Sequence, residues 1–152
     1  MRLVAYKYRF KPSKEQAEML EHTFGCVRFV YNNALAFSKE QYEQGNKTNF
    51  NDWNKNLTTL KKDAGFSWLK NVSSVPLQQS LKAFKAFFKS GFGYPKFKNK
   101  RGKQSACYMA NAFKFNADTK QITLAKMKNP LKVKLSRLFN GSPSLLQAKL
   151  LV

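Results

Sequence analysis

The chain has 152 residues, 43% of them hydrophobic, which fits one globular domain or two small interleaved ones and excludes a disordered tail. Its 28 Lys+Arg against 8 Asp+Glu leave a net charge of +20, and such a charge repels itself and favours a polyanionic partner. The possible partner classes are nucleic acid, an anionic membrane surface and an acidic protein, and the charge favours nucleic acid.

The sequence contains no apolar run of the length that a signal peptide or a membrane span requires. Cys26 and Cys107 are far apart and lack the paired spacing of a zinc site. We therefore predict two reduced, buried thiols, a cytoplasmic location, no membrane association, no metal and no cofactor.

The first ten residues alternate apolar and basic side chains, which predicts a strand that ends at Pro12. Ser13 and Gln16 then have the spacing of a capping box, the usual start of a helix. The apolar positions continue at helical spacing to Leu35, and we expect Gly25 to divide them into two helices joined by a tight turn.

Two further helices are predicted before residue 90. Trp53, Leu57 and Leu60 mark a short helix after the Gly45-Asn46 loop. The clearest helix follows a serine cap at residue 73 or 74, has Pro76 in its first turn, and carries an apolar stripe that we expect to face the core. That stripe consists of Leu77, Leu81, Phe84 and Phe88.

After Gly91 the pattern changes to a loop, and beyond that loop come short apolar runs separated by turn signals. The runs are 112–115, 122–124, 131–135 and 145–150, and the turns are 116–118, 129–130 and 140–143. This spacing predicts a small antiparallel barrel or sheet.

The charge is concentrated late in the chain, and its densest segment is a loop. Residues 1–63 hold 11 Lys+Arg and 7 Asp+Glu, whereas residues 64–152 hold 17 Lys+Arg and one acid, Asp118. Within the loop, Phe92, Tyr94 and Phe97 alternate with cations that suit a phosphate backbone, and rings of this kind stack on unpaired bases. The cations are Lys96, Lys98, Lys100, Arg101 and Lys103.

No catalytic constellation is evident. The single histidine, His22, lies in a predicted helix, and most of the acids are expected on solvated helix faces. A two-metal carboxylate cluster cannot assemble in the second half of the chain from Asp118 alone. No phosphate-binding glycine loop, dinucleotide fingerprint or Cys/His metal motif occurs.

Four ordered blocks resemble the N-terminal part of the OrfB/TnpB proteins of bacterial insertion sequences, and they cover most of residues 1–137. The first block is YRFKPS at 8–13 with GCVRFVYNNAL at 25–35. The others are WL, VSS and LQQSL within 68–81, AFFK at 86–89, and GYPKFK at 93–98.

The resemblance implies an RNA-guided DNA endonuclease family whose N-terminal part holds structured RNA and reads a short DNA motif. It implies an α+β fold in which a wedge-like, OB-like antiparallel β-barrel of residues 1–10 and 105–152 is interrupted by a helical recognition lobe of residues 13–90. The basic aromatic loop, residues 91–104, would hold phosphates. On this analogy the predicted motif readers are Phe50, Ser74, Gln78 and Asn111, with Lys82 beside them. Gln78 suits an adenine edge.

The resemblance does not extend to the family's RuvC-type nuclease acids and zinc-ribbon cysteines, so we expect a nucleic-acid-binding fragment without a nuclease centre. The alternatives are a structural RNA-binding protein of ribosomal type and a nuclease subunit that is active only with a partner chain. A membrane-surface binder would need one helix with an open apolar face. A helix-turn-helix repressor would need more polar side chains in its second helix, so we expect residues 14–44 to pack as scaffold.

Overall fold

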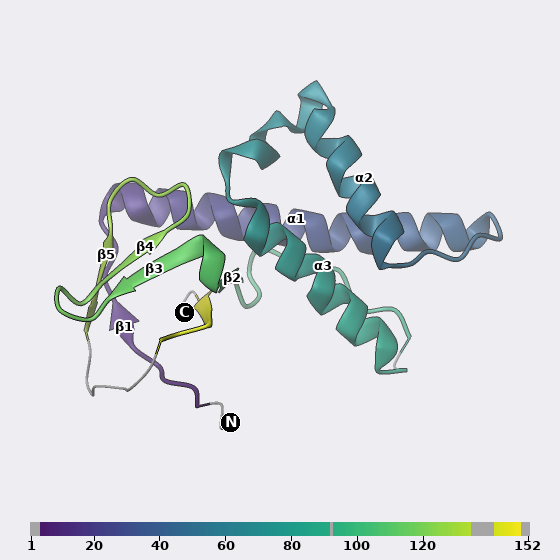
Figure 1. Cartoon of the computed structure of the whole chain (residues 1–152). Helices are drawn as coiled ribbons and strands as arrows, with labels where there is room; N and C mark the ends of the chain where they lie inside the picture. Colours follow the sequence, from purple (N-terminus) through teal and green to yellow (C-terminus); the bar gives the residue numbers. More distant parts are fainter. Residues whose placement is uncertain (1–3, 92, 135–141, 150–152) are drawn as a thin grey trace.

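The computed structural model describes residues 4–91, 93–134 and 142–149, which form the expected α+β fold (Figure 1). Within these residues there are three α-helices and two short 3-10 helices, here labelled η. The helices are α1 (Lys14–Glu43), α2 (Phe50–Lys62), η1 (Ala64–Asn71), α3 (Ser74–Lys89) and η2 (Ala110–Ala112). The strands are β1 (Arg9–Phe10), β2 (Ser105–Met109), β3 (Phe113–Asn116), β4 (Gln121–Leu124), β5 (Leu131–Lys134) and β6 (Leu145–Lys149).

The expected division at Gly25 is wrong, because α1 is one continuous helix of 30 residues. Its start is as predicted: the Ser13 hydroxyl accepts from the backbone N–H of Gln16, and the Gln16 side chain accepts from that of Ser13. An unbroken stripe that includes Leu20, Phe24 and Val27 holds the helix through Gly25. A glycine in a helix interior costs only about 1 kcal/mol, and that stripe of buried side chains outweighs it.

The next two helices confirm the sequence pattern. Asn49 and Asp52 form a second capping box at the start of α2, which buries Trp53 and Leu57. Ser73 caps α3 by accepting the backbone N–H of Val75, and α3 buries three of its four predicted stripe residues, Leu77, Leu81 and Phe84. The fourth, Phe88, is 40% exposed.

The strands form two open antiparallel sheets in the described residues, and not the expected closed barrel. One sheet has the order β1-β5-β4-β3, and the other pairs β2 with β6. Of the strand expected over the first ten residues, the described part forms a strand only at Arg9 and Phe10, which pair with β5. Strand β2 had no predicted counterpart. Leu3, Phe92, Leu135, Asn140, Gly141 and Leu150 of the predicted segments lie outside the described residues.

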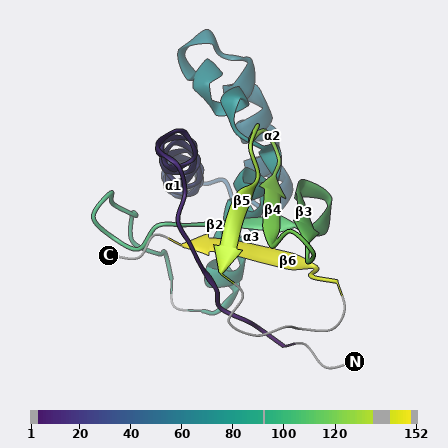
Figure 2. The same ribbon diagram turned by 90° about the vertical axis from the view of Figure 1, so that its left-hand side faces the viewer.

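A single hydrophobic cluster runs from the helices into both sheets, and it places α3 between α1 and β2. Figure 1 shows the larger sheet at the N-terminal end of α1. Figure 2 shows β3, β4 and β5 in front of α2 and α3, with α1 seen end-on beside them. The side-chain amide of Gln16, in α1, donates to the carbonyls of Asn129 and Pro130, just before β5, and so joins the helices to the larger sheet. Among the described helices, none has the length and apolar character needed to cross a membrane.

Candidate nucleic-acid interface

The basic aromatic loop is fastened to α1 at Lys98. The Asn32 side chain donates to the Lys98 carbonyl and accepts from the Lys98 backbone N–H, both at 2.8 Å. These paired bonds reproduce the pairing of two strands and hold the loop against the middle of α1. The loop is therefore a positioned segment and not merely a solubilising tail.

Gln104 shapes the cationic turn from inside. Its amide nitrogen lies 3.0 Å from the carbonyls of Asn99 and Gly102 and 3.3 Å from that of Lys100, and its oxygen accepts from Arg28 at 3.0 Å. The side chain is only 8% exposed, so the bonds are shielded from water. The buried amide of Gln104 thus binds the backbone carbonyls on the inside of the turn. The side chains of Lys100, Arg101 and Lys103 lie on its outside, where all three are exposed.

Two aromatic rings remain at the surface beside these cations. Tyr94 is 37% exposed and Phe97 is 52% exposed. The ammonium of Lys39, from α1, lies 5.6 Å from the Tyr94 centroid and 5.2 Å from that of Phe97, at cation–π distance from both. Tyr94 also makes an edge contact with Phe88 at 5.1 Å. The rings are therefore held in place and yet accessible.

The cations of the loop differ in how far they are available to bind a phosphate. Lys98 folds back so that its ammonium lies 4.1 Å from the Tyr31 centroid, and its partial burial lowers its pKa. Its charge is thus partly engaged with α1. Lys96, Lys100, Arg101 and Lys103 are exposed and remain the cations best placed to meet phosphates.

The predicted motif readers on α3 share one solvent-facing stripe. Ser74, Gln78 and Lys82 follow at intervals of four residues, and all three are exposed. Lys85 continues the stripe, and its ammonium lies 5.1 Å from the ring centroid of Phe50. Phe50 itself begins α2 and packs in part against the core. Asn111 is exposed in η2, directly after β2, which packs on α3.

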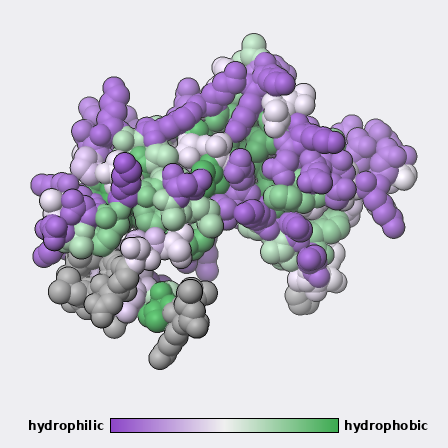
Figure 3. Space-filling view, in the orientation of Figure 1, coloured by the Kyte–Doolittle hydropathy of each residue, from purple (hydrophilic) through white to green (hydrophobic). Residues whose placement is uncertain are grey.

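The sequence reasoning missed Lys39, Asn32 and Gln104, the residues that hold the loop. Lys39 and Asn32 lie in α1, more than 50 positions from the loop, and a local pattern carries no signal of such a contact. Gln104 follows the run of cations and could have been noticed only as an uncharged break in it. In Figure 3 hydrophilic residues cover much of the face shown, and a hydrophobic patch lies over the C-terminal half of α3.

The two cysteines and the single histidine contribute to packing between elements of the fold. Cys26 is buried, and burial raises the pKa of its thiol to about 11, so it is not a thiolate at neutral pH. Cys107 is half-buried, less than predicted, and burial raises its pKa also. His22 Nε2 lies 3.3 Å from the Trp68 carbonyl and thereby joins α1 to η1. In the described parts of the chain no three His, Cys, Asp or Glu side chains gather as metal ligands.

Comparison with known proteins gives one family match and several relatives. Residues 1–47 match the model HTH_OrfB_IS605, described as a helix-turn-helix domain. Two curated relatives bear the name "Putative RNA-guided DNA endonuclease". The one from Streptomyces pristinaespiralis is 42% identical over 88% of this chain. The other, called InsQ, from Escherichia coli K12, is 36% identical over 83% of this chain. The chain spans about a third of their length, 34% and 32%.

A third relative is similar in length to the matched part of the chain. It is the virulence protein VsdF of Salmonella dublin, which is 35% identical over 66% of this chain and 97% of its own length. These matches define the class, the transposon-associated proteins that begin with a helix-turn-helix region. The chain belongs to the OrfB/TnpB family. Its region matching the helix-turn-helix model contains the single helix α1 in the structure.

Proposed function

We propose that the chain binds nucleic acid through the basic aromatic loop and the neighbouring faces of α1 and α3. The observation that carries this proposal is the pair of accessible rings, Tyr94 and Phe97, set beside exposed cations and held by Lys39. Rings that stack on bases and cations that follow the backbone together form the usual surface for single strands. The family relationship supports the same partner.

Within that function, the partners would be structured RNA and DNA beside a target, in keeping with the names of the relatives. The loop would hold RNA phosphates, and the Ser74, Gln78 and Lys82 stripe would face the DNA motif with Phe50 and Asn111. Gln78 presents an exposed amide of the kind that pairs with adenine in the major groove. In this scheme residues 13–90 form the recognition lobe, and 1–10 with 105–152 form the wedge-like part.

Binding without cleavage is the activity that we propose for these 152 residues. Hydrolysis of a phosphodiester by the two-metal route needs carboxylates gathered around Mg²⁺. Seven of the eight acids precede residue 64, and the described ones form no ligand group. Incubation of the purified chain with Mg²⁺ and supercoiled DNA should therefore leave the DNA intact, and nicking that depends on the chain would overturn this part of the proposal.

The binding itself is tested with a fluorescent, structured RNA across a salt series. Affinity should fall by roughly 10³-fold or more between about 50 and 200 mM salt if six or more phosphates are contacted. Phe97→Leu should weaken binding by about 1–3 kcal/mol because it removes one stacking ring while keeping an apolar side chain. The variant K100Q/R101Q/K103Q should both weaken binding and flatten its salt dependence.

A matched control separates the surface from net charge. K47Q/K55Q/K62Q removes the same three charges from exposed positions in the loop before α2 and on α2 itself. We expect it to bind nearly as the parent does, with circular dichroism showing all variants folded. Equal losses in the two triple variants, or a response independent of salt in the parent, would refute a role for the loop.

A further inference from the structure

The Lys39 ammonium occupies a position that both exposed rings of the basic aromatic loop share. It lies 5.6 Å from the Tyr94 centroid and 5.2 Å from the Phe97 centroid, over both rings at once. A base placed at this position would contact two rings, whereas a base on an outer face would contact only one. The ammonium and a stacking base therefore compete for the same aromatic surface.

Contacts other than Lys39 also hold the loop. The Asn32 side chain bonds the Lys98 backbone twice, at 2.8 Å each, directly after the second ring. The Tyr94 ring makes an edge contact with Phe88 of α3, with the centroids 5.1 Å apart. These contacts would keep both rings in place when the ammonium of Lys39 leaves them.

A second cation–π contact joins the loop to α1 in the opposite direction, and its ring is buried. The Lys98 ammonium lies 4.1 Å from the Tyr31 centroid, and Tyr31 is only 4% exposed, so a base cannot reach that ring. Lys39 instead lies over rings at the surface, where a ligand can take its place. The contact of Lys98 is thus fixed by the fold, and the contact of Lys39 is open to exchange.

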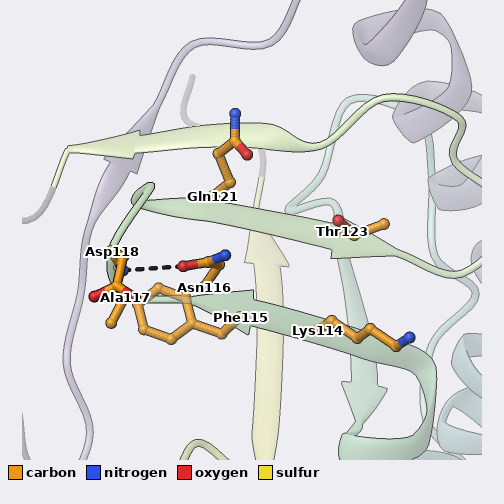
Figure 4. A pocket seen from close by; sticks show the side chains of 7 residues that line it. All are labelled: Lys114, Phe115, Asn116, Ala117, Asp118, Gln121 and Thr123. Carbon is orange, nitrogen blue, oxygen red and sulfur yellow. Dashed lines mark hydrogen bonds between the residues drawn. The ribbon is translucent and has the colours of Figure 1, made fainter.

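The recess at the β3–β4 hairpin does not offer a similar exchange (Figure 4). Its lining includes one cation and one ring, Lys114 and Phe115. The two residues are neighbours in β3, so their side chains leave opposite faces of the strand. A base stacked on Phe115 would not displace the Lys114 ammonium.

We propose that Lys39 is a displaceable latch, which makes the basic aromatic loop selective for strands with unpaired bases. An unpaired base enters the position between Tyr94 and Phe97 and displaces the ammonium, which then pairs with a phosphate of the same strand. A polyanion without bases offers the rings no replacement, so Lys39 stays in place. This inference rests on the proposed function, because it assigns base stacking to the same rings.

The strengths of the two kinds of contact permit the exchange. A cation–π contact at an exposed site changes an equilibrium constant by about 2- to 5-fold. Stacking of one base on an aromatic side chain changes it by roughly 5- to 150-fold. The base therefore gains more from the rings than the ammonium loses, and the released cation adds a phosphate contact.

The test compares the parent with Lys39→Met on two short single strands of equal length and charge, one with bases and one abasic. Methionine keeps an unbranched apolar side chain and removes the charge. For the strand with bases, we expect Lys39→Met to lower the slope of log affinity against log salt by about 0.7, the value of one phosphate contact. The slope for the abasic strand should not change. At high salt the variant should bind the strand with bases about 2- to 5-fold more tightly for each ring released.

Two further variants serve as controls. Lys39→Arg keeps a cation that can lie over the rings and should retain the parent's difference between the two strands. Lys55→Met removes an exposed charge from α2 and should leave both slopes unchanged.

NMR spectroscopy observes the latch directly. Protons above ring faces are shifted upfield, and the Lys39 ε-methylene signal is identified by its absence from the spectrum of Lys39→Arg. This signal should move when the strand with bases binds and stay in place when the abasic strand binds.

Equal changes of the salt slope for the two strands, or no change for either, would overturn the inference. An ε-methylene signal that stays in place when the strand with bases binds would also overturn it, because the base would then stack elsewhere. Weaker binding of that strand by Phe97→Leu would in either case leave the proposed function standing. A parent that binds neither strand would overturn both.

Discussion

At the scale of single residues, the shape of the loop depends on Gln104. A buried amide that serves three carbonyls and one guanidinium cannot be replaced by water without rearrangement. Lys98 differs from the exposed cations of the loop, because its ammonium lies over the Tyr31 ring and its backbone is bonded to Asn32. It therefore helps to fix the loop on α1.

Gln104→Ala should destabilise the protein by about 1–3 kcal/mol, because it leaves shielded carbonyls and the Arg28 guanidinium without their partner. Urea unfolding followed by circular dichroism measures the loss, and the same variant should bind single-stranded nucleic acid more weakly because the turn loses its shape. Gln147→Ala, at an exposed position of β6, is the control. A change no larger than that control would show that the turn holds without the amide.

At the scale of elements, α1 shows that burial along a helix overrides a local breaking signal. Gly25 has no conformational role in the structure: a Cβ added there would meet only the Arg28 guanidinium nitrogen Nη2, at 3.9 Å. Gly45 is different, because it ends the turn after α1 with φ of +84°.

Alanine substitutions at these two glycines should therefore change the stability of the protein in opposite directions. Gly25→Ala should stabilise the protein by about 0.5–1 kcal/mol by favouring the helix, whereas Gly45→Ala should cost about 1–2 kcal/mol because the backbone there is left-handed. Thermal unfolding of the two variants beside the parent measures both effects. Destabilisation by Gly25→Ala would indicate that α1 bends or divides at this position.

At the scale of the whole molecule, the net charge of +20 opposes the compact state through repulsion between cations. The crowding is visible at Lys61, whose pKa is lowered by burial and then by the charge of Lys126. The Lys126 ammonium in turn donates to the Lys70 carbonyl, which keeps cations from a turn of the sheet and from α2 close together. The net charge of +20 makes such proximity hard to avoid.

The melting temperature should accordingly rise as salt is added from about 10 mM to about 150 mM, since the screening length falls from about 30 Å to about 8 Å. Duplex nucleic acid at about 100 times its dissociation constant, at fixed ionic strength, should add about 2.7 kcal/mol of stability. Dextran at the same mass concentration is the neutral control. A melting temperature indifferent to salt would show that charge repulsion does not limit the fold.

Local patterns were enough where neighbours in sequence make the structure. The capping box of Ser13 and Gln16, the stripe of α3 and the β3, β4 and β5 runs all follow from spacing and are present. The four ordered blocks likewise predicted the family that the comparisons show. The functional residues were harder, because exposed side chains carry no periodic signal of their own.

The sequence by itself determined the net charge of +20, the α+β class and the family, because charge, periodicity and motif order are properties of the chain in any conformation. Only the tertiary structure decided that α1 continues through Gly25, that the sheets stay open in the described residues, and that Lys39 and Gln104 hold the loop. These outcomes depend on contacts between distant residues, whose free energy arises only when the core has brought them together.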